Sequence, residues 1–160
     1  MQQLYAYIFE NASTRQLKTD LGKTILFKDL IPRELEIIVQ KTNIRAYRAG
    51  DHVFFQGDPG AALYVILRGN IEIERQDGSK KTTLAHLTSG MFFGELAIVY
   101  EGIRTATAHV TEDATLFCLF KHDLDRLLKQ HPRLANKLLL NLSRILAERL
   151  RSTNEKLSRR

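Results

Sequence analysis

The sequence of 160 residues predicts a mainly β fold, an antiparallel sandwich or barrel, with helices before and after it. Between Asn43 and Phe120, apolar and polar residues alternate as they do in strands that bury one face. Turn signals interrupt this alternation every eight to twelve residues or so, which is typical of such folds. On both sides of this region the apolar spacing is helical, so we expect flanking helices.

The first 24 residues are expected to form a helical extension. The spacing of Leu4, Ile8 and Phe9 predicts one apolar helical face. Candidate caps are Ser13, Thr14 and Asp20. This extension either docks a partner or packs beside the last helix. A second helix is expected to begin at Pro32 and to run to Val39, since proline suits a first helical turn.

The strands are expected to be short, and each ends at a turn. They cover 44–47, 53–55, 62–67, 71–75, 82–87, 105–110 and 115–120. The sequence has a single cysteine, Cys118, which lies in the last strand. Because there is only one, an internal disulfide and a cysteine-rich metal site are excluded. An apolar strand favours a packed thiol over a nucleophile.

Beyond Phe120 a short helix is expected over 123–128, followed from Pro132 to about Leu157 by one long amphipathic helix. A heptad-like seam runs along it: Ala135, Leu139, Leu142, Leu146, Leu150, Thr153 and Leu157. A second apolar set is expected to pack on the barrel: Leu134, Leu138 and Ile145. One barrel cannot support a helix about 39 Å long, so we expect a homodimer through this helix.

The segment 92–108 carries the candidate binding chemistry. Gly94 lets the backbone approach a ligand closely, and Arg104 can clamp a phosphate with its planar fork. Glu95 accepts hydrogen bonds only, which suits a hydroxyl. Free amides at the start of a short helix favour anions, and two residues supply them here: Leu96 and Ala97. One small ligand with a phosphate and a sugar hydroxyl would satisfy these groups.

These residues resemble the cyclic nucleotide-binding domain found in bacterial catabolite activator-type regulators and in cyclic-nucleotide-dependent kinases. The resemblance covers about residues 25–157. It rests on 50–58, on 63–69, and on the cassette Phe93-Gly94-Glu95-Leu96-Ala97 with Arg104-Thr105-Ala106. It implies an eight-stranded jelly roll over 25–131, after the extension 1–24 and before a dimerisation and lid helix over 132–160.

The resemblance also implies a role for each residue of the cassette. Glu95 accepts from the ribose 2′-hydroxyl and Arg104 pairs with the cyclic phosphate. The rest of the cradle consists of the amides of Gly94, Leu96 and Ala97, with Thr105 near phosphate or base and Ala106 after it. Ile103 stands where many members have proline, which should loosen the turn without removing a ligand group.

Two features point to different nucleotides. Thr105 resembles the cGMP-type kinase cassette. Thr153 and Asn154 match the positions of catabolite activator that contact the adenine amino group, one of them from the partner subunit. We expect cAMP rather than cGMP, and the dimer would then bring both long helices over the pocket.

Three function classes follow. The first is a sensor that passes cyclic nucleotide binding through its last helix to an unknown effector protein. The second is the sensor portion of a catabolite activator-type transcription regulator. The third is a member that has lost the ligand, in which Glu95 and Arg104 simply pair. An enzyme of the metal-binding jelly-roll type would need clustered histidines, and two of them, His86 and His109, lie in predicted strands where they could face inward. We nevertheless expect no enzyme, no catalytic residue, no metal and no other cofactor. The sequence has no nucleophile elbow or Walker-type loop, and its histidines lack ligand spacing: His52, His86, His109, His122 and His131.

The net charge of +6 comes mostly from the last seventeen residues, where basic side chains are typical of a solvated helix end. We therefore expect no nucleic-acid binding by this chain alone. No apolar run of about 18 residues exists, so no membrane span is expected. The N-terminus lacks the features of a secretory signal, which makes the cytoplasm the expected location.

Overall fold

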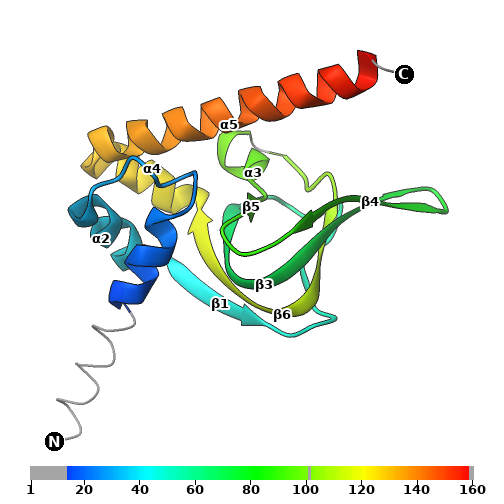
Figure 1. Ribbon diagram of the computed structural model, residues 1–160, viewed down its shortest axis with the longest axis horizontal. Coiled ribbons are helices and arrows are strands. Elements are labelled where there is room, and N and C mark those ends of the chain that lie inside the picture. The colour runs from blue at the N-terminus through cyan, green and yellow to red at the C-terminus, as the bar shows by residue number, and fades with distance from the viewer. Residues whose placement is uncertain (1–13, 101, 159–160) are drawn as a thin grey trace, which may run out of the picture.

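The computed structural model describes residues 14–100 and 102–158, so the expectations for Leu4, Ile8, Phe9 and Ser13 lie outside the described part. Residues 14–22 are helical and precede α2 (Pro32–Gln40). After the sheet come α4 (Lys121–Gln130) and α5 (Pro132–Ser158), as the periodicity predicts. Figure 1 shows α5 lying along one side of the sheet and beside the other helices. In the part that the structure describes, no helix has the length and apolarity to cross a membrane.

The described strands form one six-stranded antiparallel sheet, so the predicted antiparallel strands with flanking helices are confirmed. The main order is β1-β6-β3-β4, while β2 pairs with β6 and β5 pairs with β3. Their bounds are β1 (Asn43–Tyr47), β2 (His52–Phe54), β3 (Ala62–Asp77), β4 (Lys80–Leu87), β5 (Phe92–Phe93) and β6 (Thr107–Phe120).

The expected count of eight strands differs from the six described, because β3 and β6 each continue through a predicted turn. Gly69, at the centre of the expected turn 68–70, has φ +89°. A Cβ at this residue would lie 2.6 Å from the Ala114 Cα of β6. The register between β3 and β6 shifts on both sides of it. This glycine therefore permits a bulge with a close crossing of two strands, which bends both without ending either.

Two apolar clusters bury both faces of the sheet at the first half of β3. Leu63, Val65 and Phe117 pack against the helices, whereas Tyr64 and Cys118 belong to the cluster on the opposite face. Burial raises the pKa of the Cys118 thiol to about 11, which leaves it protonated and unreactive at neutral pH. The prediction of a packed strand thiol is confirmed.

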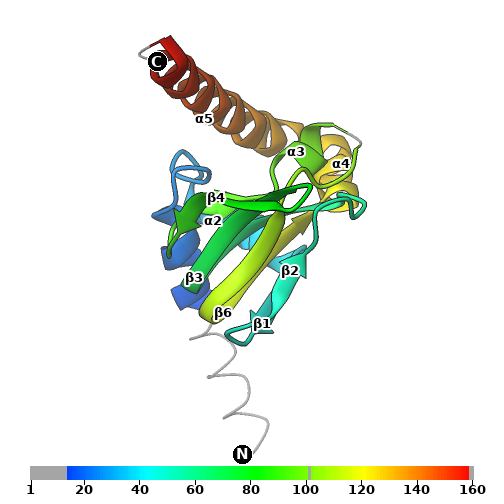
Figure 2. The same cartoon turned by 90° about the vertical axis from the view of Figure 1, so that its right-hand side faces the viewer.

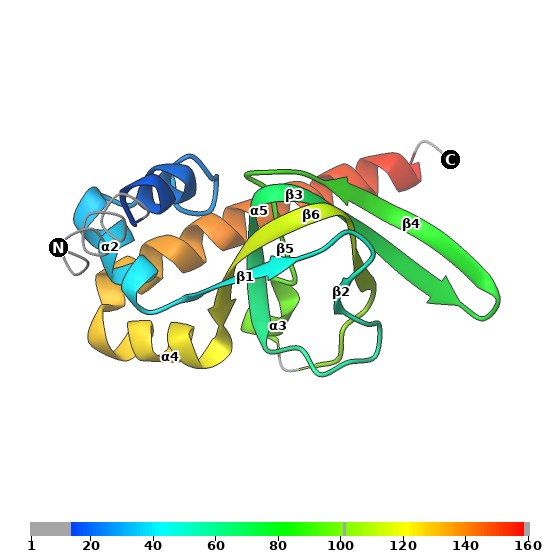
Figure 3. The same cartoon turned by 90° about the horizontal axis from the view of Figure 1, so that it is seen from below.

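The first half of α5 is built into this core. Its expected barrel-facing residues are buried: Leu134, Leu138 and Ile145. Two positions of the expected dimer seam, Ala135 and Leu142, are also buried within the chain, so they cannot face a partner. They pack there because α5 lies against α4 and the N-terminal segment, where Asn141 Nδ2 donates to the Leu26 carbonyl at 3.2 Å. Figure 3 shows this N-terminal segment beside α5.

Beyond Leu146, α5 leaves the core. Leu150 and Leu157 are more than 60% exposed, and the helix has no described neighbour on that face. In the described part of the N-terminal extension, Leu21 belongs to the same core cluster as the buried residues of α5. The prediction of a homodimer through α5 therefore applies only to the exposed half of this helix.

Glu34 links α2 to α5 and gives a pH-dependent prediction. Its carboxylate accepts from Lys137 Nζ at 2.8 Å and from the Ile31 amide at 3.0 Å. Burial raises the pKa of Glu34, but these bonds outweigh it and leave the pKa below the ordinary value of 4.5. The group therefore stabilises the fold above pH 4.5, and this contribution is lost as the pH falls through its lowered pKa.

We expect Glu34→Gln to reduce the free energy of unfolding at pH 7 by about 1 kcal/mol or less, since the pair is partly exposed. The difference from the wild type should shrink when the pH falls below 4.5. Denaturant unfolding at several pH values measures it. Glu36→Gln, in the more exposed pair with Lys18, is the control and should change little. An unchanged difference at low pH would contradict the role of the Glu34 carboxylate.

Candidate functional site

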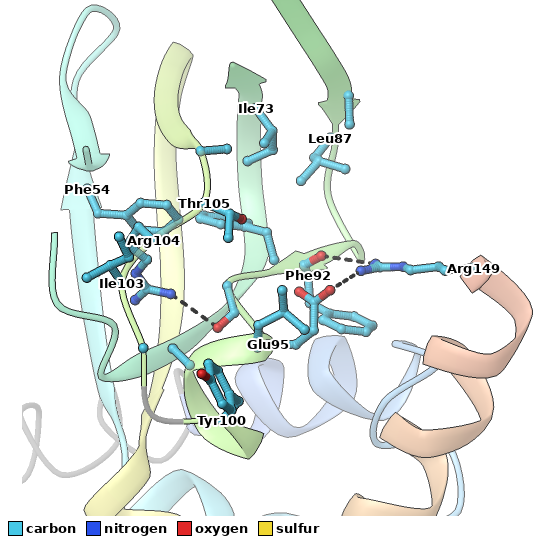
Figure 4. A pocket seen from close by; sticks show the side chains of 17 residues that line it. Phe54, Ile73, Leu87, Phe92, Glu95, Tyr100, Ile103, Arg104, Thr105 and Arg149 are labelled. Carbon is cyan, nitrogen blue, oxygen red and sulfur yellow. Dashed lines mark hydrogen bonds and ion pairs between the residues drawn. The ribbon is translucent and has the colours of Figure 1, made fainter. Parts of the chain in front are cut away.

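A pocket of about 410 Å³ opens between the inner face of the sheet and the segment 92–106 (Figure 4). Its wall is mostly apolar, and charged groups reach it from three places: Glu95, Arg104 and Arg149. This combination of an apolar wall and a few converging polar groups is typical of small-molecule sites. The apolar wall consists of Phe54, Ile73, Ala85, Leu87, Phe92, Phe93, Ala97, Tyr100 and Ile103.

The backbone turns sharply into this pocket at Gly94, which follows the last residue of β5 and lies two residues before the start of α3 (Leu96–Val99). Gly94 has φ +74°. A Cβ here would lie 2.8 Å from Arg104 Nη1 and 3.0 Å from the Ala62 carbonyl oxygen. Only glycine therefore fits between the β3 backbone and the guanidinium.

The return of the chain at Arg104 is held by the turn that follows β2. The Arg104 amide donates to the Asp58 carbonyl at 2.7 Å, and the Gly57 amide donates to the Arg104 carbonyl at 2.8 Å. Ile103 forms an isolated bridge with Pro59. These bonds fix the turn although the residue before the arginine is Ile103 and not proline.

Arg104 brings a buried positive charge to the floor of the pocket. The residue is only 7% exposed, and its guanidinium lies 4.0 Å from the centre of the Phe54 ring. Nη1 and Nη2 donate to the carbonyls of Gly94 and Ala62 at 3.2 and 2.9 Å. Nε is buried and lacks a hydrogen-bond partner among the described residues.

No carboxylate in the described ranges forms an ion pair with Arg104. The carboxylates of Asp58 and Glu95 influence the guanidinium only through their charge, without a hydrogen bond to it. Burial lowers the pKa of this guanidinium, although Tyr64, Asp58 and Glu95 oppose the effect. Arginine stays charged even so. A buried cation that donates to two carbonyls and has no carboxylate partner among the described residues favours an incoming anion.

Glu95 is engaged by α5 and not by Arg104. Its Oε1 accepts from Arg149 Nη1 at 2.5 Å, while Arg149 Nη2 lies 3.4 Å from the Phe92 carbonyl oxygen. The Arg149 guanidinium also sits 4.7 Å from the centre of the Phe92 ring. The Glu95 side chain is 12% exposed and no described bond uses its Oε2. That oxygen can accept from a ligand hydroxyl while Oε1 stays paired.

The structure brings seven of the nine residues predicted for the site around this one pocket. They are Gly94, Glu95, Leu96, Ala97, Arg104, Thr105 and Ala106. One detail of the expected cradle differs: the Ala97 amide is not free, because it donates to the Gly94 carbonyl at 3.3 Å. This bond closes the first turn of α3, and its length makes it weak.

The other two predicted residues do not line the pocket of the single chain. Thr153 and Asn154 lie on the exposed half of α5, where Thr153 Oγ1 donates to the Arg149 carbonyl. Asn154 borders a shallow surface depression together with Leu150 and Arg151. Their expected contact with a base stays a prediction that requires a second copy of the chain.

Sequence reasoning missed Arg149, Tyr100 and the apolar residues that β2, β3 and β4 contribute to the wall. Arg149 lies one helical turn before Thr153 on the same side of α5, so the helical period could have added it. The inner face of β3 and β4 contributes Ile73, Ala85 and Leu87. The strand period of two could have assigned these residues to the inner face. No local pattern marks Tyr100, which is 73% exposed at the pocket rim.

A family model described as the cyclic nucleotide-binding domain matches residues 44–131, more than half of the chain. The chain belongs to this family. The match includes β1 from its second residue, β2–β6, α3, α4 and the whole cassette.

Individual relatives agree with the family. The cyclic AMP receptor protein of Thermus thermophilus is 37% identical over 130 residues, which cover 81% of this chain and 58% of that protein. Glutaminase 1 of Bradyrhizobium diazoefficiens is 35% identical over 86% of this chain, but the match covers 22% of that enzyme. The chain thus spans less than two thirds of the length of these relatives.

The crystal structure of the Thermus thermophilus catabolite activator protein superimposes with a TM-score of 0.77 at 35% identity. The alignment covers 84% of this chain and 62% of that one. The N-terminal domain of a transcriptional regulator from Streptomyces coelicolor has a TM-score of 0.73 at 30% identity, covering 84% of this chain and 94% of that domain.

Proposed function

We propose that this domain binds cAMP in the pocket beneath α3 and passes the binding event to α5. The observation that carries the proposal is the buried Arg104 guanidinium, which has no carboxylate partner among the described residues. A cyclic phosphate supplies the missing anion, and the planar fork suits its oxygens. The cyclic AMP receptor protein among the relatives supports the choice of nucleotide.

In this proposal the other pocket residues divide the rest of the nucleotide. Glu95 Oε2 accepts from the ribose 2′-hydroxyl while Arg149 holds Oε1. Thr105, exposed at the rim, contacts phosphate or base. The apolar inner face at Ile73, Ala85 and Leu87 covers the flat faces of the ligand. Thr153 and Asn154 of a partner's α5 complete the adenine contact in a homodimer.

The link between pocket and helix is the ion pair of Glu95 and Arg149. It joins the residue assigned to the ribose directly to α5, 54 positions later in the chain. A ligand that adds a bond to Glu95 changes the position of this carboxylate and hence of Arg149. The ligand therefore shifts the arrangement of the exposed half of α5 toward the one that it binds better.

Calorimetric titration of the protein with cAMP and with cGMP tests the proposal. We expect saturable binding with one nucleotide per chain, tighter for cAMP. Preference for cGMP would assign the site to guanine through Thr105. If neither nucleotide gives heat or competes for the site, the protein belongs to the third class, the family members that have lost nucleotide binding.

Arg149→Ala gives a test of the link itself. We expect the affinity for cAMP to fall by up to about five-fold, because a partly exposed ion pair contributes about 1 kcal/mol or less. Ligand-dependent protection of the amides beyond Leu146, measured by hydrogen exchange, should disappear. Arg151→Ala, two residues further on the same helix, is the control and should preserve both. Protection that persists without Arg149 would mean that the signal reaches α5 by another contact.

A second candidate function is the sensor portion of a transcription regulator. It is favoured by the likeness to the N-terminal domain of a transcriptional regulator from Streptomyces coelicolor, 94% of which is covered. Sequencing of the transcript gives the full coding length, and the encoded protein can then be assayed for DNA binding with and without cAMP. This assay distinguishes a transcription regulator from a stand-alone sensor. A nucleotide-dependent DNA complex supports the regulator.

A further inference from the structure

A row of histidine and glutamate side chains crosses the sheet on the face opposite the pocket. The strand register sets His52 of β2 opposite His109 of β6, His109 opposite Glu72 of β3, and Glu72 opposite His86 of β4. Directly opposite residues project from the same face of a sheet. Figure 2 shows β4, β3, β6 and β2 side by side in this order.

The strand alternation separates this row from the nucleotide pocket. Ile71 and Ile73 flank Glu72 and point to the inside, where Ile71 is buried in the core and Ile73 lines the pocket. Glu72 and the next residue of the same face, Glu74, therefore project outward. The expectation that His86 and His109 could face inward, as in a metal-binding barrel, differs from this register, because their neighbours Ala85 and Ala108 occupy the inner face.

Three ligand-type atoms converge on this outer face. One oxygen of Glu72, one oxygen of Glu74 and one ring nitrogen of His109 lie within 4.8 Å of one another. His109 Nδ1 is 3.9 Å from Glu74 Oε1, too far for a hydrogen bond. This nitrogen is shielded from solvent and has no hydrogen-bond partner among the described residues.

Neighbouring groups hold these three side chains in place. The His52 ring stacks on the His109 ring at 4.9 Å, and Phe55 stacks on the other side of His52 at 4.6 Å. Thr83 Oγ1 donates to Glu72 Oε1 at 2.7 Å. His109 is thus fixed with Nδ1 toward the carboxylates, and His52 is a positioning residue.

Two carboxylates this close need a positive charge between them. Lys81 supplies part of it, since its Nζ lies 2.8 Å from Glu74 Oε2. On the other side, His86 Nδ1 lies 3.9 Å from Glu72 Oε1, and the His86 side chain is largely exposed. Lys81 is bonded to Glu74, and His109 Nδ1 has no hydrogen-bond partner among the described residues. A metal ion accepts lone pairs from all three side chains at once.

We propose that Glu72, Glu74 and His109 form a site for a divalent transition-metal ion of the zinc type on the outer face of the sheet. Imidazole nitrogen with two carboxylate oxygens is a ligand set that zinc, cobalt and nickel accept. Metal–ligand distances of about 2.0–2.2 Å require the three atoms to draw together by a small side-chain movement. His86 or water takes the fourth position.

Calorimetric titration of the tag-free, chelator-treated protein with Zn²⁺ tests this site without any nucleotide. We expect one ion per chain. Glu72→Gln and His109→Asn should each weaken binding by about ten-fold or more, because even partners of metal ligands contribute that much. Lys81→Gln should tighten binding, since it removes the cation that competes for Glu74. Titration with Co²⁺ should give visible absorption bands of an ordered site.

His122→Gln is the matched control, because this exposed histidine of α4 lies outside the row. Its Zn²⁺ affinity should equal that of the wild type. Absence of saturable Zn²⁺ binding, or binding that Glu72→Gln and His109→Asn leave unchanged, overturns the proposal. Thermal unfolding without metal checks that each variant is folded. The cAMP titration reads the pocket on the opposite face separately, so either site can fail without the other.

Discussion

Arg104→Ala is expected to lower the affinity for cAMP by about ten- to a hundred-fold. A charge-assisted hydrogen bond contributes about 1.5–3 kcal/mol, and each 1.4 kcal/mol is a factor of ten in the dissociation constant. The loss should be larger than that of any other single residue in the pocket, because Arg104 is its only cation that is almost fully buried among the described residues. Calorimetry or displacement of a fluorescent cAMP analogue measures it.

The variant also removes both donors from the carbonyls of Gly94 and Ala62, so its stability must be measured alongside binding. Arg104→Lys separates charge from geometry: it keeps the cation but not the planar fork, and we expect an intermediate affinity. Arg75→Ala, which removes an exposed arginine paired with Asp77, is the control. A folded Arg104→Ala protein that binds cAMP with wild-type affinity would place the ligand elsewhere.

The cassette could be predicted from sequence because its chemistry is local. Gly94, Glu95 and the start of α3 are consecutive, and Arg104 returns after one short helix and one turn. Few conformations connect such residues, so the pattern nearly determines the geometry. Seven predicted residues accordingly line one pocket.

Features that depend on distant contacts could not be predicted in this way. Gly69 reads locally as a turn, and only the close crossing of β6 at Ala114 makes it a bulge within one strand. Ala135 and Leu142 fit a heptad seam, but the N-terminal segment and α4 cover that face of α5 first. A period in the sequence identifies an apolar face without naming what buries it.

The outer row of histidines illustrates the same limit in another form. His52, His86 and His109 have no ligand spacing along the chain, which is why the sequence predicts no metal site. They become neighbours of Glu72 and of one another only through the register of four strands. Register depends on the bulges of β3, and these follow from tertiary packing.

Gly94→Ala has the second largest expected effect, and it tests the geometry of the pocket floor. The new Cβ would adopt φ +74°, a conformation that costs an alanine about 1–2 kcal/mol. It would also lie 2.8 Å from Arg104 Nη1 and 3.0 Å from the Ala62 carbonyl oxygen. Overpacking of this kind costs about 1–3 kcal/mol more. We expect reduced stability in denaturant unfolding and at least about a ten-fold loss of cAMP affinity, since Arg104 must move.

Gly78→Ala isolates the two contributions, because Gly78 also has a positive φ, +60°, but nothing within 4 Å of its Cβ position. In this variant at the tip of the β3–β4 hairpin, the free energy of unfolding should fall only by the cost of the positive φ, because there is no clash. Its cAMP affinity should be that of the wild type. The difference between the two variants therefore measures the contact between residue 94 and Arg104. Equal losses of stability with unchanged binding in both would show that the guanidinium does not depend on the glycine, and that the pocket floor can adjust around a methyl group.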